Sequence, residues 1–261
     1  MKRICIYGKG GIGKSTAAAN VAAALAESGL KVAVVGCDPK ADSTRCLMGR
    51  RIPTVLGQRG DPETEIAFLG YGGVLCIESG GPEPGTGCAG RGIIAAMQEI
   101  RSRKLLEGVD AVLYDVLGDV VCGGFSMPLR EGIADEVYLV TTADFMSLYA
   151  ANNICRGIAK YAADGPVRLA GLICNQRSSL LNPELVERFA EKIQSRVIGK
   201  IPMSAAIGRA ELAGRTVLEA EPESGISQSF RRLARAMLEN TLRTVPRPLT
   251  DQEVEDLCRF P

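Results

Sequence analysis

The 261-residue sequence contains no histidine and no tryptophan. Any acid–base or metal chemistry must therefore use carboxylates, lysines or cysteine thiolates. Charge of one sign is not in excess either, because 31 Lys and Arg nearly balance 30 Asp and Glu, for a net charge of +1. This balance argues against a protein that binds nucleic acid or a membrane surface through bulk charge, and we expect neither as a partner.

Long apolar runs are also missing. No stretch of 18 apolar residues occurs, and the chain enters a predicted strand at its second residue. We therefore expect no membrane span and no signal peptide, and we expect a cytoplasmic protein. In that setting the nine cysteines, an odd number, do not fit a disulfide framework. Metal or cluster ligation explains so many thiols better.

Most of the cysteines nevertheless fit structural positions. Cys5 and Cys174 lie inside apolar segments, where cysteine behaves as a small hydrophobic residue. Cys46, Cys155 and Cys258 have no glycine-rich or charged surroundings, and we predict structural roles for them.

Apolar runs alternate with helical patterns over most of the chain. This order predicts an α/β fold with a mostly parallel, doubly wound sheet flanked by helices. We expect a single domain over residues 1–243 and a C-terminal surface tail over residues 244–261, with a surface excursion at Gly49–Gly70. The predicted strands are Lys2–Tyr7, Lys31–Val35, Val74–Glu78, Asp110–Asp115, Glu136–Thr141, Leu169–Asn175 and Val197–Ile201. The predicted helices are Ser15–Ser28, Gly92–Leu106, Met146–Ala163, Pro183–Ser195, Ser204–Leu212 and Ser224–Leu242.

The first predicted strand leads into a phosphate-binding pattern. The sequence from Gly8 to Ser15 fits G-x-x-x-x-G-K-[ST], with a strand before it and an Ala-rich helix after it. In such a loop consecutive backbone N–H groups face one anion at a helix N-terminus. Lys14 would reach the outer phosphates and the Ser15 hydroxyl would ligate magnesium. The alternative is a glycine-rich turn that binds nothing. The predicted nucleotide contacts here are Gly8, Lys9, Gly10, Gly11, Ile12, Gly13, Lys14, Ser15 and Thr16.

Two further loops follow predicted strands and should open on the same edge of the sheet. One runs from Asp38 to Thr44, and the other, Asp115–Asp119, has the form of a Walker-B strand end. With no histidine present, a carboxylate is the natural group to position or deprotonate the attacking water, and Asp38 and Asp119 are the candidates. A single aspartate at a strand end can also be only a cap or turn residue.

Lys9 adds a second cation to the P-loop. It could be solvated, or it could reach a nucleotide in a facing subunit.

Cys88 and Cys122 differ from the other cysteines because small residues surround both. Cys88 lies within Gly87-Cys88-Ala89-Gly90 ahead of a predicted helix, and Cys122 precedes Gly123-Gly124 a few residues beyond Asp115. Small neighbours leave room for a bulky inorganic group, and nearby backbone N–H groups can bond its sulfides. Two cysteines are half the ligands of a [4Fe–4S] cluster, which suggests a symmetric dimer that shares one. Neither lies in a CxxC motif, so spacing alone leaves a structural role open.

Four segments together resemble the nitrogenase iron protein family and its nitrogenase-like reductase relatives: GKGGIGKST, GCDPKADST, ESGGPEPGTGCAGRG and YDVLGDVVCGGFSMPLR. The resemblance extends from Lys2 to about Leu242. It implies a P-loop α/β homodimer that binds MgATP, with Cys88 and Cys122 of each subunit holding one shared [4Fe–4S] cluster.

The resemblance also implies roles for individual residues. Lys9 would sense nucleotide across the subunit interface, Lys14 and Ser15 would hold phosphate and magnesium, and Asn175 would contact the adenine. Arg91 matches an arginine that is ADP-ribosylated in some members. The first switch would comprise Asp38, Lys40, Asp42 and Ser43, and the second switch Asp115 and Asp119, leading to Cys122.

The implied activity is ATP-dependent transfer of a low-potential electron to a separate catalytic protein of the nitrogenase or methylthio-alkane reductase type. Ferredoxin or flavodoxin would be the electron donor. Two alternatives remain: electron delivery to a tetrapyrrole reductase, acting on a nickel-cofactor precursor or on protochlorophyllide, and a cluster-free partitioning or scaffold ATPase. The short segment between Thr44 and Gly70 and the short C-terminus depart from the nitrogenase iron protein, and these surfaces could suit a different partner.

Overall fold

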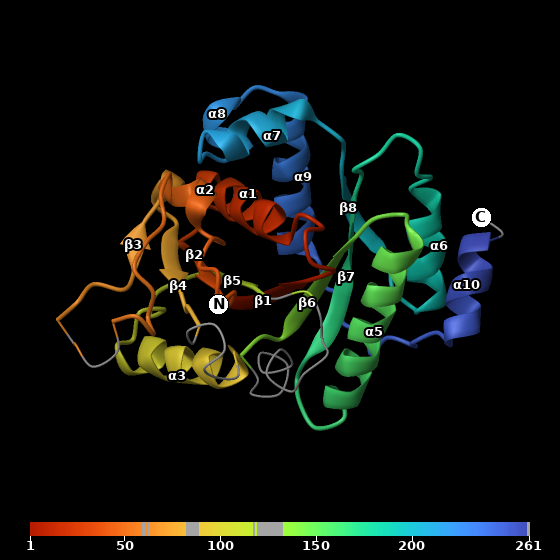
Figure 1. Cartoon of the computed structure of the whole chain (residues 1–261), viewed down its shortest axis with the longest axis horizontal. Coiled ribbons are helices and arrows are strands. Elements are labelled where there is room, and N and C mark those ends of the chain that lie inside the picture. The colour runs from red at the N-terminus through yellow and green to blue at the C-terminus, as the bar shows by residue number, and fades with distance from the viewer. Residues whose placement is uncertain (59–60, 62, 82–88, 117, 119–132, 260–261) are drawn as a thin grey trace.

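The computed structural model describes residues 1–58, 61, 63–81, 89–116, 118 and 133–259. Its described part forms an eight-stranded sheet in the order β3-β4-β2-β5-β1-β6-β7-β8, with helices on both faces (Figure 1). All neighbouring strands pair in parallel except β3, which runs antiparallel to β4 at the edge. This arrangement confirms the predicted fold class.

All seven predicted strands are present, with bounds that differ from the prediction by at most one residue. The short edge strand β3 was not predicted, because two residues are too few to show the alternating hydrophobic pattern of a strand. The strands are β1 (Lys2–Tyr7), β2 (Val32–Gly36), β3 (Phe68–Leu69), β4 (Leu75–Glu78), β5 (Ala111–Asp115), β6 (Glu136–Thr141), β7 (Arg168–Asn175) and β8 (Val197–Ile201).

The strands are apolar on both faces because each face of the sheet has its own core. In β1, Cys5 and Tyr7 point into one cluster of buried residues, and Ile4 and Ile6 point into the other. The first core is covered by α3, α5, α6 and α10, and the second by α1, α2, α7, α8 and α9 (Figure 1). Their bounds are α1 (Lys14–Glu27), α2 (Arg45–Met48), α3 (Ala89–Ser102), α5 (Phe145–Tyr161), α6 (Glu184–Lys192), α7 (Ala205–Leu212), α8 (Val217–Ala220), α9 (Gly225–Glu239) and α10 (Asp251–Arg259), with a 3₁₀ turn η1 (Tyr71–Gly73).

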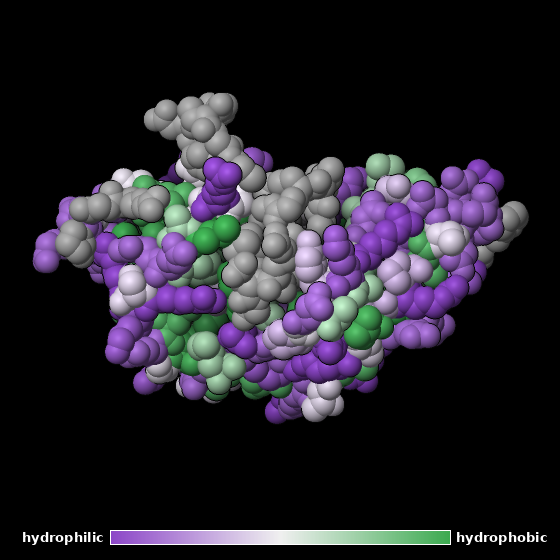
Figure 2. All heavy atoms as spheres, turned by 90° about the horizontal axis from the view of Figure 1, so that it is seen from below, coloured by the Kyte–Doolittle hydropathy of each residue, from purple (hydrophilic) through white to green (hydrophobic). Residues whose placement is uncertain are grey.

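Figure 2 shows the molecule from below. Mainly hydrophilic side chains cover its right part, where α5 and α10 lie. This surface fits amphipathic helices that turn their apolar stripe toward the sheet. No helix in the described part of the chain is both long and apolar enough to cross a lipid bilayer.

Helix α1 carries the P-loop on its N-terminal end and packs closely against the sheet and α9. Its many alanines permit this close approach, since ten of its fourteen residues are buried. The one buried amide, Asn20, is satisfied: it donates to the Thr16 carbonyl oxygen at 2.8 Å and accepts from the Val217 N–H at 2.8 Å. The helix that presents the phosphate-binding loop is therefore rigidly held.

Two segments contribute more to the core than the sequence indicated. The segment Gly49–Gly70, expected to be a surface excursion, buries Ile52, Val55 and Ile66. The segment also joins the edge of the main sheet through an isolated β-bridge between Thr54 and Glu78.

Residues 244–261, expected to be a surface tail, contain α10, whose Val254 and Leu257 are buried against the core. The side-chain amide of Asn152 in α5 bonds both the N–H and the carbonyl of Leu249 at 2.8 Å. This part of the chain thus lies on the outside of the molecule but is tied to it through buried contacts. A single pair of apolar residues three apart is too weak a pattern to reveal the helix from sequence.

Candidate functional site

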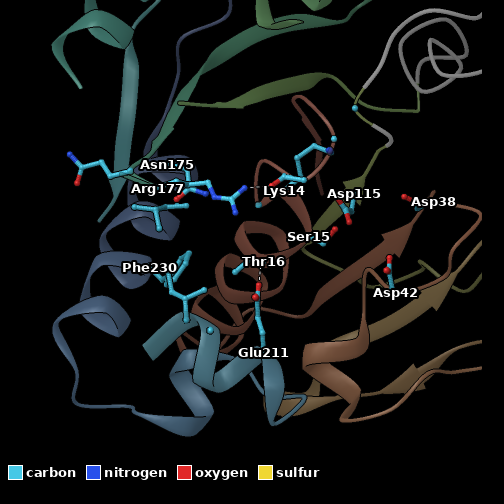
Figure 3. Close-up of a pocket in the computed structure, with 18 of the residues that line it drawn as sticks. Lys14, Ser15, Thr16, Asp38, Asp42, Asp115, Asn175, Arg177, Glu211 and Phe230 are labelled. Atoms are coloured by element: carbon cyan, nitrogen blue, oxygen red, sulfur yellow. Dashed lines mark hydrogen bonds between the residues drawn. The ribbon is translucent and has the colours of Figure 1, made fainter. Parts of the chain in front are cut away.

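The carboxyl ends of β1, β2, β5, β7 and β8 open into one cavity of about 550 Å³ (Figure 3). This is where ligands bind in open α/β sheets. The cavity brings together side chains from the three loops singled out in the sequence and from a second wall that was not predicted. The lining residues predicted from sequence are Gly10, Gly11, Gly13, Lys14, Ser15, Thr16, Asp38, Lys40, Asp42, Asp115 and Asn175.

The P-loop forms the floor of the cavity. Gly13 has a φ of 96°, the left-handed region that glycine adopts without strain, and it directly precedes α1. The Lys14 side chain is only 8% exposed, and its ammonium donates to the Lys9 carbonyl oxygen at 3.1 Å. Lys9 itself is half-buried. One lysine therefore lies within the loop, and the other is partly open to solvent.

Asp115, at the end of β5, is a buried carboxylate that lines the cavity. Its side chain is 2% exposed, and its Oδ1 is buried without a hydrogen-bond partner among the described residues. Burial raises the pKa of this carboxyl, and the hydroxyls of Ser15 and Ser43 and the ammonium of Lys14 act in the opposite direction. The Ser15 hydroxyl lies next to it (Figure 3). An unpartnered carboxylate oxygen beside a hydroxyl is a donor set that fits Mg²⁺, a hard cation with oxygen ligands.

Gly118 follows Asp115 in the predicted second switch, and its backbone packs against the backbone of the P-loop. A Cβ atom at this position would collide with the Gly8 carbonyl oxygen and stand 2.6 Å from the Gly10 nitrogen. The start of the predicted second switch is thus in backbone contact with the phosphate-binding loop.

The opposite wall of the cavity was missed by the sequence analysis, Asn175 excepted. The Asn175 amide donates to the Ile12 carbonyl oxygen at 2.7 Å, and the Arg177 guanidinium donates to the Gly11 carbonyl oxygen. Glu211 of α7 accepts a hydrogen bond from the Thr16 hydroxyl (Figure 3). Position after a strand could have indicated Gln176 and Arg177, whereas no sequence signal marked the residues from α7, α9 and the loop before α7, which are Met203, Ser204, Ile207, Gly208, Glu211 and Phe230.

A second buried carboxylate, Glu78, lies beneath the cavity at the end of β4, and it too was missed. Its side chain has no exposed surface, and its Oε1 accepts hydrogen bonds from both the N–H and the hydroxyl of Thr44 at 2.7 Å. Burial raises the pKa of Glu78 to about 7, the charges of Asp115 and Asp42 act in the same direction, and the bonds from Thr44 oppose them.

This raised pKa predicts a specific pH dependence of stability. Between the pKa of about 4.5 expected in the unfolded chain and about 7 in the folded one, the folded state binds more protons, so its stability falls as the pH rises. The loss reaches roughly 3 kcal/mol at pH 8 for this one group. We expect Glu78→Gln, which keeps an acceptor for Thr44, to reduce by roughly 5 °C the fall in melting temperature between pH 5 and pH 8. Equal pH profiles of the two proteins in thermal unfolding would contradict this assignment.

Seven of the nine cysteines lie among the described residues, and all fit structural positions. Five are buried, and Cys46 and Cys258 are half-buried. Burial raises the pKa of every one of these seven thiols, which disfavours the thiolate that a metal requires. Within the described ranges no three His, Cys, Asp or Glu side chains gather as a metal site.

Three predicted site residues, Cys88, Asp119 and Cys122, lie outside the described residues. Arg91 is described; it is exposed in the first turn of α3.

Comparison with known proteins identifies the family. Residues 2–260 match the 4Fe-4S iron sulfur cluster binding proteins of the NifH/frxC family. The chain belongs to this family. It is 52% identical to the nitrogenase iron protein of Methanococcus voltae over 98% of this chain and 95% of that one. It is 53% identical to nitrogenase iron protein 2 of Methanothermobacter thermautotrophicus, over 99% and 98% of the two chains. The predicted cofactors, a [4Fe–4S] cluster and MgATP, are those of this family.

Solved structures support the fold alone. The septum site-determining protein MinD of Pyrococcus horikoshii has a TM-score of 0.71 at 23% identity, covering 92% of this chain and 97% of that one. Cobyrinic acid a,c-diamide synthase of Mycobacterium smegmatis has a TM-score of 0.64 at 17% identity, covering 91% and 94%. The similarity to these two solved structures is therefore one of architecture, whereas the similarity to the nitrogenase iron proteins extends over the sequence.

Proposed function

We propose that the protein is the ATP-dependent reductase component of a two-component system, delivering low-potential electrons to a separate catalytic protein. The observation that carries this proposal is the match of nearly the whole chain to cluster-binding iron proteins, in a fold whose cavity is built for MgATP. The cluster supplies the electron that is transferred. The chain's own residues bind the nucleotide, hold the cluster and connect the two.

The nucleotide roles follow from the cavity. The P-loop N–H groups and Lys14 hold the phosphates, and Ser15 and the unpartnered Asp115 carboxylate hold magnesium. Asp38 and Asp119 are the carboxylates we assign to the attacking water. Asn175, on the wall away from Asp115, is assigned to the adenine.

Lys9 is assigned to the nucleotide of a second copy of the chain. It sits on the P-loop, is half-buried, and does not line the cavity of its own chain. A cation delivered from a facing subunit would stabilise charge on the transferred phosphoryl group, as an arginine finger does. This role requires a homodimer.

Cys88 and Cys122 are assigned to the cluster, one pair from each subunit. The resemblance of their two motifs to the family implies this pair. The seven described thiols are less suited, because burial raises their pKa values. Gly118 lies against the P-loop four residues before Cys122 in the chain, so a change at the phosphates can reach that cysteine through a short covalent path.

Lys40, Asp42 and Ser43 complete the first switch. Arg91, exposed in α3, is a candidate for ADP-ribosylation.

For the catalytic partner we propose a nitrogenase-like protein with its own metal cluster, of the nitrogenase or methylthio-alkane reductase type. A tetrapyrrole reductase is the alternative outcome of the test. Ferredoxin or flavodoxin is the proposed electron donor.

The test uses the anaerobically purified, dithionite-reduced protein, mixed with a candidate partner of each type. Oxidation of the cluster, followed by its visible absorbance, should occur with MgATP and not with MgADP. Oxidation only with the tetrapyrrole-binding partner would select the alternative. A protein that contains no iron, or that delivers electrons equally without nucleotide, would contradict the proposal.

A further inference from the structure

Beneath the nucleotide cavity lies a cluster of buried polar atoms without partners. Five buried side-chain oxygen or nitrogen atoms lack a hydrogen bond among the described residues, and four of them belong to this one place: Ser43 Oγ, Glu78 Oε2, Ser79 Oγ and Asp115 Oδ1. The centre of the cluster is Gly36, which pairs with Glu78 on one side and with Asp115 on the other. Buried polar groups without partners are rare in native proteins, so four together call for a functional explanation.

The Glu78 side chain lies flat over Gly36. A Cβ atom on Gly36 would collide with Glu78 Oε2 and stand 2.8 Å from Ser43 Cβ. From this position Glu78 Oε1 takes two hydrogen bonds from Thr44, which ends the loop that begins at Asp38. The side chain of Glu78 therefore anchors the far end of the first switch to the sheet.

The backbone of Glu78 is anchored to another segment. Its carbonyl oxygen accepts from the Val55 N–H at 2.8 Å, and the Ser79 carbonyl accepts from the Leu56 N–H at 3.2 Å. Just beyond, a Cβ on Gly80 would stand 2.7 Å from Thr54 Cβ. On this side, residues 54–56 therefore hold the chain leaving β4 through two backbone hydrogen bonds and one close contact.

On the other side the same chain touches the first switch a second time. A Cβ on Gly81 would stand 2.9 Å from Pro39 Cα. Pro39 directly follows Asp38, which lines the cavity. The loop from Asp38 to Thr44, which carries the first switch, therefore contacts the exit of β4 near both of its ends, through Thr44 on Glu78 and through Pro39 on Gly81.

We propose that Glu78 is a positioning residue that couples the first switch to the chain leaving β4, which continues in sequence to Cys88. A shift of Thr44 on nucleotide binding leaves a fully buried carboxylate without its two donors, so Glu78 and the adjoining residues 79–81 must move with it. This route is separate from the one through Gly118 toward Cys122. The inference rests on the proposed function, because it assumes a cluster at Cys88 and a nucleotide in the cavity.

The experiment compares two matched pairs of variants in the cluster-loaded dimer. Glu78→Met removes the acceptor at similar length, and Glu78→Gln keeps it. Thr44→Val removes the hydroxyl at constant shape, and Thr44→Ser keeps it. The measurement is the rate of iron removal by a chelator with saturating MgATP, divided by the rate without nucleotide, after MgATP binding has been titrated separately.

We expect the MgATP-induced acceleration to fall at least fivefold in Glu78→Met and at least twofold in Thr44→Val, with Glu78→Gln and Thr44→Ser close to the unmodified protein. Hydrogen–deuterium exchange should show the same pattern: the nucleotide-induced change at the Leu56 and Ser79 amides disappears in the two variants that lose the contact. If Glu78→Met does not fold, the Thr44 pair decides alone, since the valine change is isosteric.

Two outcomes separate the two hypotheses. If the unmodified protein accelerates with MgATP and all four variants accelerate equally, the role of Glu78 is overturned and the proposed function stands. If the unmodified protein shows no acceleration, the proposed function itself fails. A purely structural role for Glu78 would lower the melting temperature and leave the acceleration ratio unchanged, which also overturns the inference.

Discussion

Replacing Cys88 or Cys122 by serine is expected to reduce the iron content from about four atoms per two chains to less than about one. A serine hydroxyl is not ionised at neutral pH and is a poor ligand for iron, so a cluster that depends on two thiolates from each subunit loses half of its ligands. The brown colour of the anaerobic protein should disappear with the iron. Iron analysis and visible absorbance of the purified variants measure this directly.

The matched controls are Cys46→Ser and Cys258→Ser. Both thiols are half-buried, and burial raises the pKa of each, so neither is expected to bind iron. These controls should keep the full iron content. Iron retained in Cys88→Ser or Cys122→Ser, or lost equally in the controls, would remove the basis for the cluster assignment.

Replacing each of the two P-loop lysines by alanine in turn should separate nucleotide binding from nucleotide sensing. Lys14→Ala removes a buried ammonium beside the phosphate position, and we expect MgATP binding to weaken about 10- to 100-fold, the cost of a charged hydrogen bond. Lys9→Ala removes a half-buried ammonium that acts across the subunit interface. It should bind MgATP within about threefold of the unmodified protein, yet lose roughly 10³-fold in hydrolysis and lose the MgATP-accelerated iron chelation.

Equilibrium binding, phosphate release and iron chelation, measured on the same samples, test this separation. Lys31→Ala is the control, because Lys31 is exposed just before β2, at the opposite edge of the sheet from the cavity. If Lys9→Ala and Lys14→Ala weaken binding to the same extent, Lys9 serves its own nucleotide and the proposed action across the interface is wrong.

The parts predicted correctly from the sequence depend on short stretches of chain. The bounds of β1, β6 and β8 agree with the prediction at both ends. The interiors of β1 and β6 are short, buried apolar runs, which a local pattern reveals. The P-loop was also predictable, since its glycines and Lys14 all lie within the short stretch from Gly8 to Lys14. The family followed from four such local motifs, and the match over residues 2–260 confirms it.

Other features were beyond any local pattern. Glu211 reaches Thr16 from 195 residues away, and Phe230 joins the same cavity from α9. Helix α10 was predicted as part of a surface tail, because its two buried apolar residues are covered by contacts with α5 and α6 that the sequence does not show.

The sequence by itself determined the architecture, the phosphate-binding loop and the two cysteines that stand apart from the rest, because each depends on residue types at fixed short spacing. Only the tertiary structure decided which carboxylates are buried, which oxygen of Asp115 has no hydrogen-bond partner among the described residues, and that Glu78 accepts two hydrogen bonds from Thr44. Burial and hydrogen bonding are properties of a residue's neighbours in space, and here those neighbours come from strands and loops that are far apart along the chain.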